Sequence, residues 1–417
     1  MPHVGQTHRR EQSIIVRQHY ITAGFRPSSD SSTRQRKAEV VTCNERQTTL
    51  GKADVLNLIF RPGDDERDVV LRPYQGQFFD VEPLGWSDFE NCATSPAPSF
   101  PLRLGNARAM RDGEEMAPGQ AMTASAEMSL PGKVEVFGLT GGGWLPLPLG
   151  AGRTVLLDRN VVSDLQRVVE QSKEAHADSM LDIAGLGQIN PMLYALEGNR
   201  QRIPTEFALR SQLSRAHKTL SAALPSAEIL KPSPAQRRGL YQLLLESAES
   251  RVKKVAFLRE VAPLISQPVS PKKVGSVETS ILQSAGNHKV GKLSMCTLAV
   301  LSCLYDNKAE LPNESWRRPG RAVIKPKQKY DATMAHNALS DLMFLDLLAN
   351  IHALYPCERF VLYTRDRGLA AFWAALEPTG FSRGALGPAT GNFELSEGLL
   401  PALGHAARMS LLERLSG

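Results

Sequence analysis

Cysteine is scarce in this chain and its positions follow no metal-binding spacing. Five cysteines occur in 417 residues, at positions 43, 92, 296, 303 and 357, and no two form a C-x-x-C pair. An odd number of scattered cysteines argues against a disulfide framework, and the missing pair argues against a zinc ribbon. We therefore expect a reducing compartment, the cytoplasm.

Long apolar runs are also lacking. The longest apolar-leaning run, residues 293–304, is shorter than the roughly 20 residues that a membrane-spanning helix needs. The first residues, MPHVGQTHRREQ, include basic side chains but no apolar stretch follows them. The sequence predicts neither export nor membrane anchoring.

Bulk composition narrows the class of protein only slightly. Apolar residues make up 42% and charged residues 22%, which is ordinary for a soluble globular protein. The formal net charge of +6 is compatible with a polyanionic partner. A length of 417 residues predicts two domains, or one large domain with an appendage.

Residues 1–150 differ from the rest because they show no sustained helical or strand period and are rich in Pro and Gly near their end. We expect a low-order N-terminal extension here, followed by a globular domain over 151–417. An alternative is that this extension is not native product. The internal methionines that could start such a shorter chain are Met110, Met116, Met122 and Met128.

Two apolar segments in the domain read as buried strands that end in acidic residues. Thr154–Leu157 leads into Asp158, and Arg359–Tyr363 leads into Asp366. Helical patterns separate the two segments, so we expect an α/β fold with a parallel sheet covered by helices on both faces. Ligands bind such sheets at the carboxyl ends of the strands, where both aspartates are predicted to lie.

Further acids come from predicted helices. Glu206 opens a helix after Pro204, and Asp341 lies in a long helix expected over 332–354. Asn337 lies one turn before Asp341 and shares its face, whereas Asp346 lies roughly 140° further round. Carboxylates together with water are the ligands that Mg²⁺ or Mn²⁺ prefers.

The order of these motifs resembles the PIN domain family. The matching features are a strand ending in D-x-N, a Glu at the start of a later helix, an Asp in the helix before a second strand, and T-R-D-R-G after that strand. The resemblance implies a PIN-like three-layer α/β/α fold and a Mg²⁺- or Mn²⁺-dependent ribonuclease. It implies catalytic roles for Asp158, Glu206, Asp341 and Asp366, with Asp158, Asp341 and Asp366 as metal ligands, and supporting roles for Asn160, Thr364 and Asn337.

Several of these residues have simpler explanations that stay open. Asp158 can be a strand-end aspartate that caps the next helix, and Glu206 a first-turn acid favoured by the helix dipole. Glu197 competes with Glu206 for its role, and Asp346 competes with Asp341. An acid in an apolar helix can instead pair with a neighbouring base.

A basic segment precedes the long helix. Residues 315–329 contain six basic residues and no acid, and we expect a loop or an extended segment there. Such a segment can guide a phosphate backbone toward a metal site, although it can also be only a solvated loop. The predicted nucleic-acid-binding residues are Arg317, Arg318, Arg321, Lys325, Lys327 and Lys329. The domain also exceeds a minimal PIN domain by a helical insertion at about 220–330, a candidate specificity region or partner surface.

The hypothesis that follows is a cytoplasmic, metal-dependent endoribonuclease, toxin-like in character, that acts on single-stranded RNA. A protein inhibitor or antitoxin is a candidate partner. A haloacid-dehalogenase-type phosphohydrolase is a first alternative, but Asn160 stands where that chemistry needs a second aspartate. A non-catalytic PIN-like module that binds RNA or protein is the other.

Overall fold

The computed structural model describes residues 56–60, 74–78, 80–111, 114–115, 122–130, 132–150, 153–171, 188–197, 204–225, 227–306, 315–356, 358–383 and 389–416. Residues 1–55, Met116 and the side chain of Glu197, all of which enter the expectations above, lie outside this description. The chain divides into two compact units. The first is built from described residues between 57 and 134, and the second from residues 83–90 and the chain from Glu135 on.

The first unit is built around a six-stranded sheet. Its long strand β4 (Ser99–Arg111) pairs in antiparallel with β2 (Tyr74–Phe78), β3 (Asp80–Val81), β5 (Glu114–Glu115) and β6 (Met122–Ser129), and β1 (Leu56–Phe60) continues the sheet beside β2. The sequence predicts a low-order extension over residues 1–150, whereas the described residues between 56 and 129 form this sheet. Apolar and polar residues do alternate in both strands of the β4–β6 ladder, but the signal is weak, because Pro101 and Gly105 interrupt β4 and the apolar positions of β6 include the small Ala124 and Ala126.

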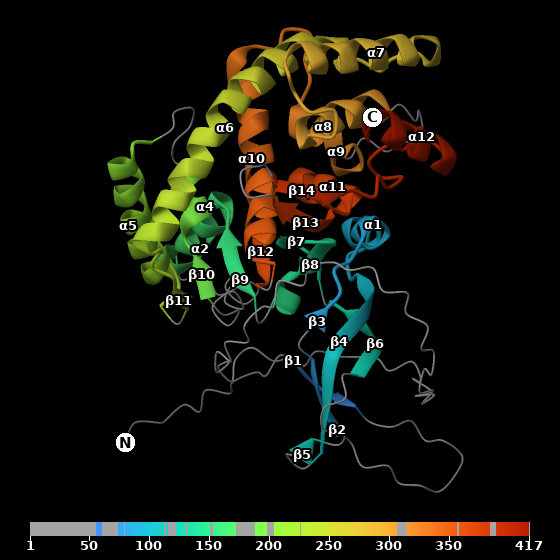
Figure 1. Ribbon diagram of the computed structural model, residues 1–417. Helices are drawn as coiled ribbons and strands as arrows, with labels where there is room; N and C mark the ends of the chain where they lie inside the picture. The colour runs from blue at the N-terminus through green and yellow to red at the C-terminus, as the bar shows by residue number, and fades with distance from the viewer. Residues whose placement is uncertain are drawn as a thin grey trace, which may run out of the picture. The chain divides into compact units, whose positions relative to one another are not determined.

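The second unit is a mixed α/β structure with a mostly parallel central sheet of six strands (Figure 1). The strand order is β11-β10-β9-β12-β7-β8. Strands β11 (Glu228–Ile229), β10 (Gln188–Asn190), β9 (Thr154–Leu157) and β12 (Phe360–Thr364) run parallel to one another. The hairpin of β7 (Phe137–Thr140) and β8 (Gly143–Pro146) is antiparallel and extends the sheet beyond β12.

Because this hairpin belongs to the α/β unit, the continuous part of that unit begins at Glu135 rather than at the expected residue 151. The glycines between its strands, which resemble a linker in the sequence, form its turn. Gly142 and Gly143 have φ values of 87° and 144°, a conformation that side chains disfavour. The carbonyl oxygen of Leu84 lies where a Cβ on Gly143 would stand.

The helices of this unit occupy the connections between strands. In chain order they are η1 (Leu147–Gly150), α2 (Arg159–Gln171), α4 (Met192–Glu197), α5 (Glu206–Ala223), α6 (Pro234–Val261), η3 (Ala262–Ile265), α7 (Pro271–Asn287), α8 (Met295–Leu304), η4 (Ser315–Arg317), α9 (Pro319–Ile324), α10 (Ala332–Leu354), α11 (Arg367–Leu376) and α12 (His405–Ser416). The small hairpin of β13 (Thr379–Arg383) and β14 (Ala389–Asn392) precedes α12. The helical insertion expected at about 220–330 therefore corresponds to α6–α9.

Alternate residues of β9 and β12 face a core on one side of the sheet, where α2 and α5 pack. The buried residues of this core are Val136, Leu147, Val155, Leu157, Val161, Val162, Leu165, Ile189, Leu220, Ala223, Leu224, Val361 and Tyr363. Leu156 and Leu362 are buried as well and alternate with the residues of this core along the strands. Helix α10 contacts β12, and α11 contacts β7 and β8.

Helix α10 spans the 23 residues that the sequence predicts, which confirms that expectation. Asp331 caps it by accepting the Met334 N–H (2.8 Å), and ten of its residues are buried. It lies against the long helix α6 (Figure 1). A second buried group is aromatic: Trp86, Phe89, Phe137 and Trp144 lie with Trp316 in a connected set of ring contacts.

Segment 315–329 differs from the loop or extended segment that the sequence predicts. It contains η4 and the short helix α9, in which Pro319 occupies the first turn, a position where its missing N–H costs nothing. Lys325 ends α9 in the left-handed conformation. Among the described residues no helix combines the length and apolar character that crossing a bilayer requires.

Candidate functional site

The two acidic strand ends meet at one edge of the central sheet. Strands β9 and β12 are parallel neighbours, with Leu157 paired to Tyr363. Asp158 follows β9, and its N–H donates to the Tyr363 carbonyl (3.1 Å). The carboxyl ends of both strands therefore deliver Asp158, Thr364 and Asp366 to the same place, as the sequence order implies.

Asp158 is buried and both of its carboxylate oxygens accept hydrogen bonds. Oδ1 accepts the Val161 N–H (2.8 Å), and Oδ2 accepts the Thr364 hydroxyl. Burial raises the pKa of Asp158, the hydrogen bonds oppose this, and the negative charge of Asp366 raises the pKa further. The hydrogen bond from Val161 caps the start of α2. Asp158 therefore does cap the next helix, as the alternative interpretation of its sequence position predicts.

Asp366 caps the next helix, α11, and shares a hydroxyl with Asp158. Its Oδ1 accepts the Leu369 N–H (2.9 Å), and its own N–H donates to Thr364 Oγ1 (3.0 Å). Thr364 thus donates to one aspartate and accepts from the backbone of the other. This single buried hydroxyl fixes the positions of Asp158 and Asp366 relative to each other.

Asp341 joins these two aspartates from helix α10. Burial raises its pKa to about 6, and the charges of Asp366 and Asp158 add to the increase, while Lys325 lowers it. Within the described residues no group donates a hydrogen bond to the Asp341 carboxylate. We call Asp158, Asp341 and Asp366 the acid cluster, because each lies within electrostatic reach of the others.

Asp346 belongs to a different environment from Asp341. Its Oδ2 accepts from Lys254 Nζ of α6 (3.0 Å), which forms a partly buried ion pair. Asp346 lies five residues after Asp341 and therefore about 140° further round α10. Of the two competing aspartates, the structure brings only Asp341 to the acid cluster.

Glu206 is not brought to the acid cluster. It is exposed in the first turn of α5, where Thr205 caps the helix by accepting the Ala208 N–H (3.2 Å). It is not among the charged groups that shift the pKa of Asp341 or Asp158. Asn160 and Asn337, expected to support the site, are exposed at the start of α2 and in α10.

The arginines of the basic segment have partners inside the fold. Arg317 pairs with Glu90 (3.6 Å) and lies over the Trp316 ring, with 4.8 Å from Cζ to the ring centroid. Arg321 pairs with the buried Asp306. Because these side chains are held by protein groups, the expected contact of Arg317 and Arg321 with nucleic acid would require breaking those pairs.

Arg318 is half-buried, and its charge lowers the pKa of the same interior group, Asp306. The three lysines differ: Lys325, Lys327 and Lys329 are all exposed. Lys325 is also the cation that opposes the increase in the pKa of Asp341. The structure therefore divides the basic segment into an inward arginine part and an outward lysine part.

Arg365 is a residue that sequence reasoning does not single out. Its guanidinium binds Asp164 of α2, and its Nη2 lies 3.3 Å from Glu135 Oε2. It thereby joins three segments beside the acid cluster. Its place between Thr364 and Asp366 is the signal that could have identified it.

The oxygen ligands of the acid cluster suit a hard divalent cation. Both carboxylate oxygens of Asp341, and Oδ2 of Asp366, accept no hydrogen bond from the residues that the structure describes. Their arrangement is not a finished metal centre. Among the residues that the structure describes, no group of three or more His, Cys, Asp or Glu side chains could hold a metal ion as arranged.

No family model matches the chain, and neither a curated protein nor a solved structure matches it. The case for a function therefore depends on the contacts and charges of the residues described above.

Proposed function

We propose that this protein is a metal-dependent endoribonuclease of PIN-like architecture, with a three-layer α/β/α domain and a site at the acid cluster. The observation that carries the proposal is the meeting of three carboxylates from separate segments at the carboxyl edge of parallel strands. Asp158 and Asp366 end neighbouring strands, and Asp341 approaches them from α10. Mutual repulsion among them favours a bound cation.

The residues of the chain have distinct roles in this proposal. The Val161 N–H and the Thr364 hydroxyl orient Asp158, and the Leu369 N–H orients Asp366. These three donors hold two ligands in place before any cation arrives, which lowers the entropy cost of binding. Asp341, whose carboxylate receives no hydrogen bond from the described residues, is the third ligand.

A bound Mg²⁺ or Mn²⁺ would lower the pKa of a coordinated water and neutralise charge on the scissile phosphate. The chain itself would exclude bulk water from Asp158, which is buried, while Asp341 is only half-buried and therefore partly accessible to an RNA backbone. Glu206 has no part in this version of the site, so the proposed set is a trio of aspartates rather than the expected quartet.

A second candidate function is a non-catalytic module that binds RNA or protein through the same edge. Two observations favour it. The described residues include no group of three or more His, Cys, Asp or Glu side chains that could hold a metal ion as arranged, and Glu206 is not part of the acid cluster. The two candidates differ in whether the acid cluster breaks a bond or only repels and positions a partner.

The test is cleavage of an end-labelled single-stranded RNA by the full chain with Mg²⁺, with Mn²⁺ and with EDTA. The variants are Asp158→Asn, Asp341→Asn and Asp366→Asn, with Asp346→Asn as the matched control on α10 and Glu206→Gln to test the fourth acid. We expect metal-dependent cutting that falls at least about 100-fold in each of the three cluster variants, the size of effect seen when a positioned catalytic group is removed.

The controls separate the possible explanations. Asp346→Asn and Glu206→Gln are expected to cut at close to the native rate. Cutting that survives EDTA, or that is lost only in Glu206→Gln, would contradict the trio. No cutting by a folded, metal-supplied chain that still binds RNA would favour the non-catalytic module.

A further inference from the structure

A short loop connects α9 to α10 and carries three lysines in five residues. Its sequence is Lys-Pro-Lys-Gln-Lys, and we call residues 325–329 the lysine loop. Lys325, Lys327 and Lys329 are all exposed, and the loop contains no acid. It is a concentrated patch of positive charge, in contrast to Arg317 and Arg321, which pair with acidic side chains of the protein.

The lysine loop is held in place at both ends and near its middle. The buried Tyr330 donates its hydroxyl to the Ile324 carbonyl across the base of the loop (2.7 Å). The Ser266 hydroxyl donates to Gln328 Oε1 (2.9 Å), which ties the loop to the end of η3. Its lysines are therefore presented by an ordered backbone rather than by a free linker.

Lys325 adopts a backbone conformation that is uncommon for a residue with a side chain. Its φ is 50° and its ψ is 53°, and its N–H donates to the Arg321 carbonyl, which ends α9 (2.9 Å). Glycine is the usual residue at such a left-handed helix end.

The first lysine of the loop adjoins the acid cluster. Lys325 ends α9, and α9 packs against the start of α11, which Asp366 caps: a Cβ on Gly368 would lie 2.5 Å from Ala322 Cβ and 3.2 Å from Asp366 Oδ1. Lys327 and Lys329 follow Lys325 in the loop, which is succeeded by Asp331, the residue that caps α10. A chain of phosphates that follows the loop would thus arrive at the aspartates.

We propose that the lysine loop is the phosphate-backbone contact that leads single-stranded RNA to the acid cluster, an inference that rests on the proposed function. Lysine ammonium groups bind phosphates as point charges, and phosphate contacts carry no sequence information directly. The amide oxygen of Gln328 accepts from the Ser266 hydroxyl, so this side chain is held against the protein. An ordered loop loses little entropy on binding.

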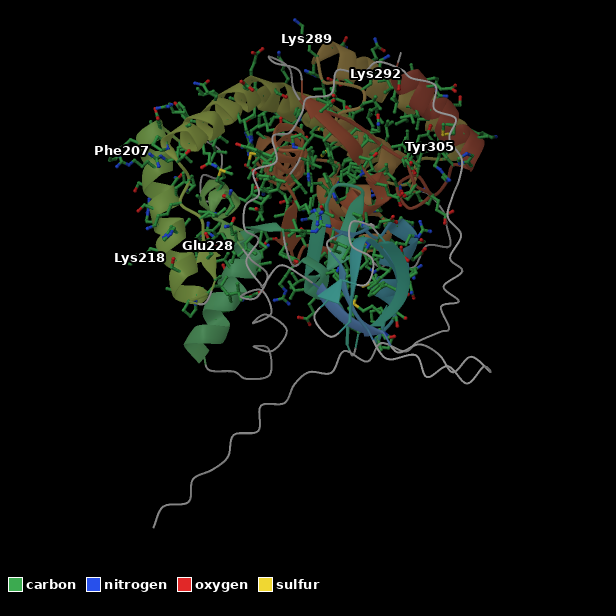
Figure 2. The ribbon with its side chains drawn as sticks, turned by 60° about the horizontal axis from the view of Figure 1, so that its bottom comes forward. Phe207, Lys218, Glu228, Lys289, Lys292 and Tyr305 are labelled. Carbon is green, nitrogen blue, oxygen red and sulfur yellow. The ribbon has the colours of Figure 1, made fainter. Side chains whose placement is uncertain are left out.

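The experiment measures binding rather than cutting. Anisotropy of a labelled oligouridylate reports the affinity of the full chain in EDTA across a salt series. The loop variant carries Lys325→Gln, Lys327→Gln and Lys329→Gln. The matched control carries Lys218→Gln, Lys289→Gln and Lys292→Gln, which remove the same charge from other exposed sites, on α5 and on the turn between α7 and α8 (Figure 2).

The expected result follows from counterion release. Each phosphate contact with a single strand contributes about 0.7 to the slope of log affinity against log salt, so three contacts contribute about 2. Over a fourfold rise in salt, the native affinity should therefore fall about 20-fold more than that of the loop variant. The control variant should keep the native slope.

Two outcomes would overturn this inference: an unchanged slope in the loop variant, or no RNA binding by the folded native chain. EDTA separates it from the proposed function, because binding is measured without a metal. A chain that binds through the loop but never cuts would leave this inference standing and remove the nuclease. Equal loss of slope in the control variant would instead indicate a diffuse charge effect and would also overturn it.

Discussion

Replacing Asp341 by asparagine should stabilise the protein at neutral pH. The Asp341 carboxylate is half-buried and lies near the charges of Asp366 and Asp158, with only Lys325 to oppose them. An ionised group in such a place costs folding free energy. Asparagine has nearly the same shape and removes the charge, so the repulsion within the acid cluster falls.

The magnitude follows from the pKa of Asp341, which is about 6 in the folded chain against an ordinary 3.8. That difference corresponds to about 3 kcal/mol when the carboxyl is fully ionised. Partial solvent access reduces it, and we expect a measured gain of about 1–2 kcal/mol at pH 7.5. The folded chain binds the proton as pH falls through 6, before the unfolded chain does so near 3.8. The native penalty is therefore full above pH 6, roughly halved at pH 5 and lost near pH 4.

Tryptophan fluorescence during urea unfolding is the suitable assay. All four tryptophans, Trp86, Trp144, Trp316 and Trp373, lie in the second unit and are buried. The signal therefore reports the unit that contains Asp341. Comparing the variant with the native chain at pH 7.5 and at pH 5 cancels the cost of burying the new amide, since that cost does not depend on pH.

Asp346→Asn provides the control of opposite sign. It removes the partner of Lys254, and at pH 7.5 it should lower the free energy of unfolding by about 1 kcal/mol. If Asp341→Asn proved no more stable than the native chain at pH 7.5, or if its gain did not shrink toward pH 5, the placement of Asp341 beside two other carboxylates would be refuted.

Three further predictions concern the same unit. Thr364→Val keeps the side-chain shape but removes the hydroxyl that links Asp158 and Asp366, and should cost about 1–3 kcal/mol in the same unfolding assay. Thr364→Ser should recover most of that loss, and a Val variant as stable as native would contradict the link. Asp306→Asn leaves the Arg321 guanidinium mostly buried without its partner and should cost about 3 kcal/mol; a loss below about 1 kcal/mol would show that the pair is not buried as described. Millimolar Mg²⁺ should raise the melting temperature of the native chain at pH 7.5, EDTA should reverse the rise, and Asp341→Asn should reduce it; equal shifts in both chains would argue against a metal at the acid cluster.

The parts of the fold that the sequence predicts well are those where one strong signal is local. Strands β9 and β12 and helix α10 are apolar runs or stripes with clear ends, and they form where expected. The hairpin of β7 and β8 is different because its glycines resemble linker composition. Only its pairing with β12, a long-range contact, distinguishes a turn from a linker.

The sequence likewise places some residues of the candidate site correctly and not others. Strand polarity alone is enough to place Asp158 and Asp366 at one edge of the sheet, and helix periodicity separates Asp341 from Asp346. Local sequence cannot reveal which way a basic side chain turns. The partner of Arg321 is Asp306, 15 residues earlier in the chain, and the position of Glu206 depends on how α5 packs.

The adjacency of β9 and β12 determines when the acid cluster can exist during synthesis. Asp158 is synthesised early, but Thr364, whose hydroxyl donates to it, follows 206 residues later in the chain. A chain that terminates anywhere before Phe360 lacks the strand next to β9 and two members of the linked Asp158–Thr364–Asp366 set. Products that end between Lys329 and Phe360 would therefore carry the lysine loop without the assembled cluster, so any hydrolytic activity of this site would begin only when β12 joins the sheet.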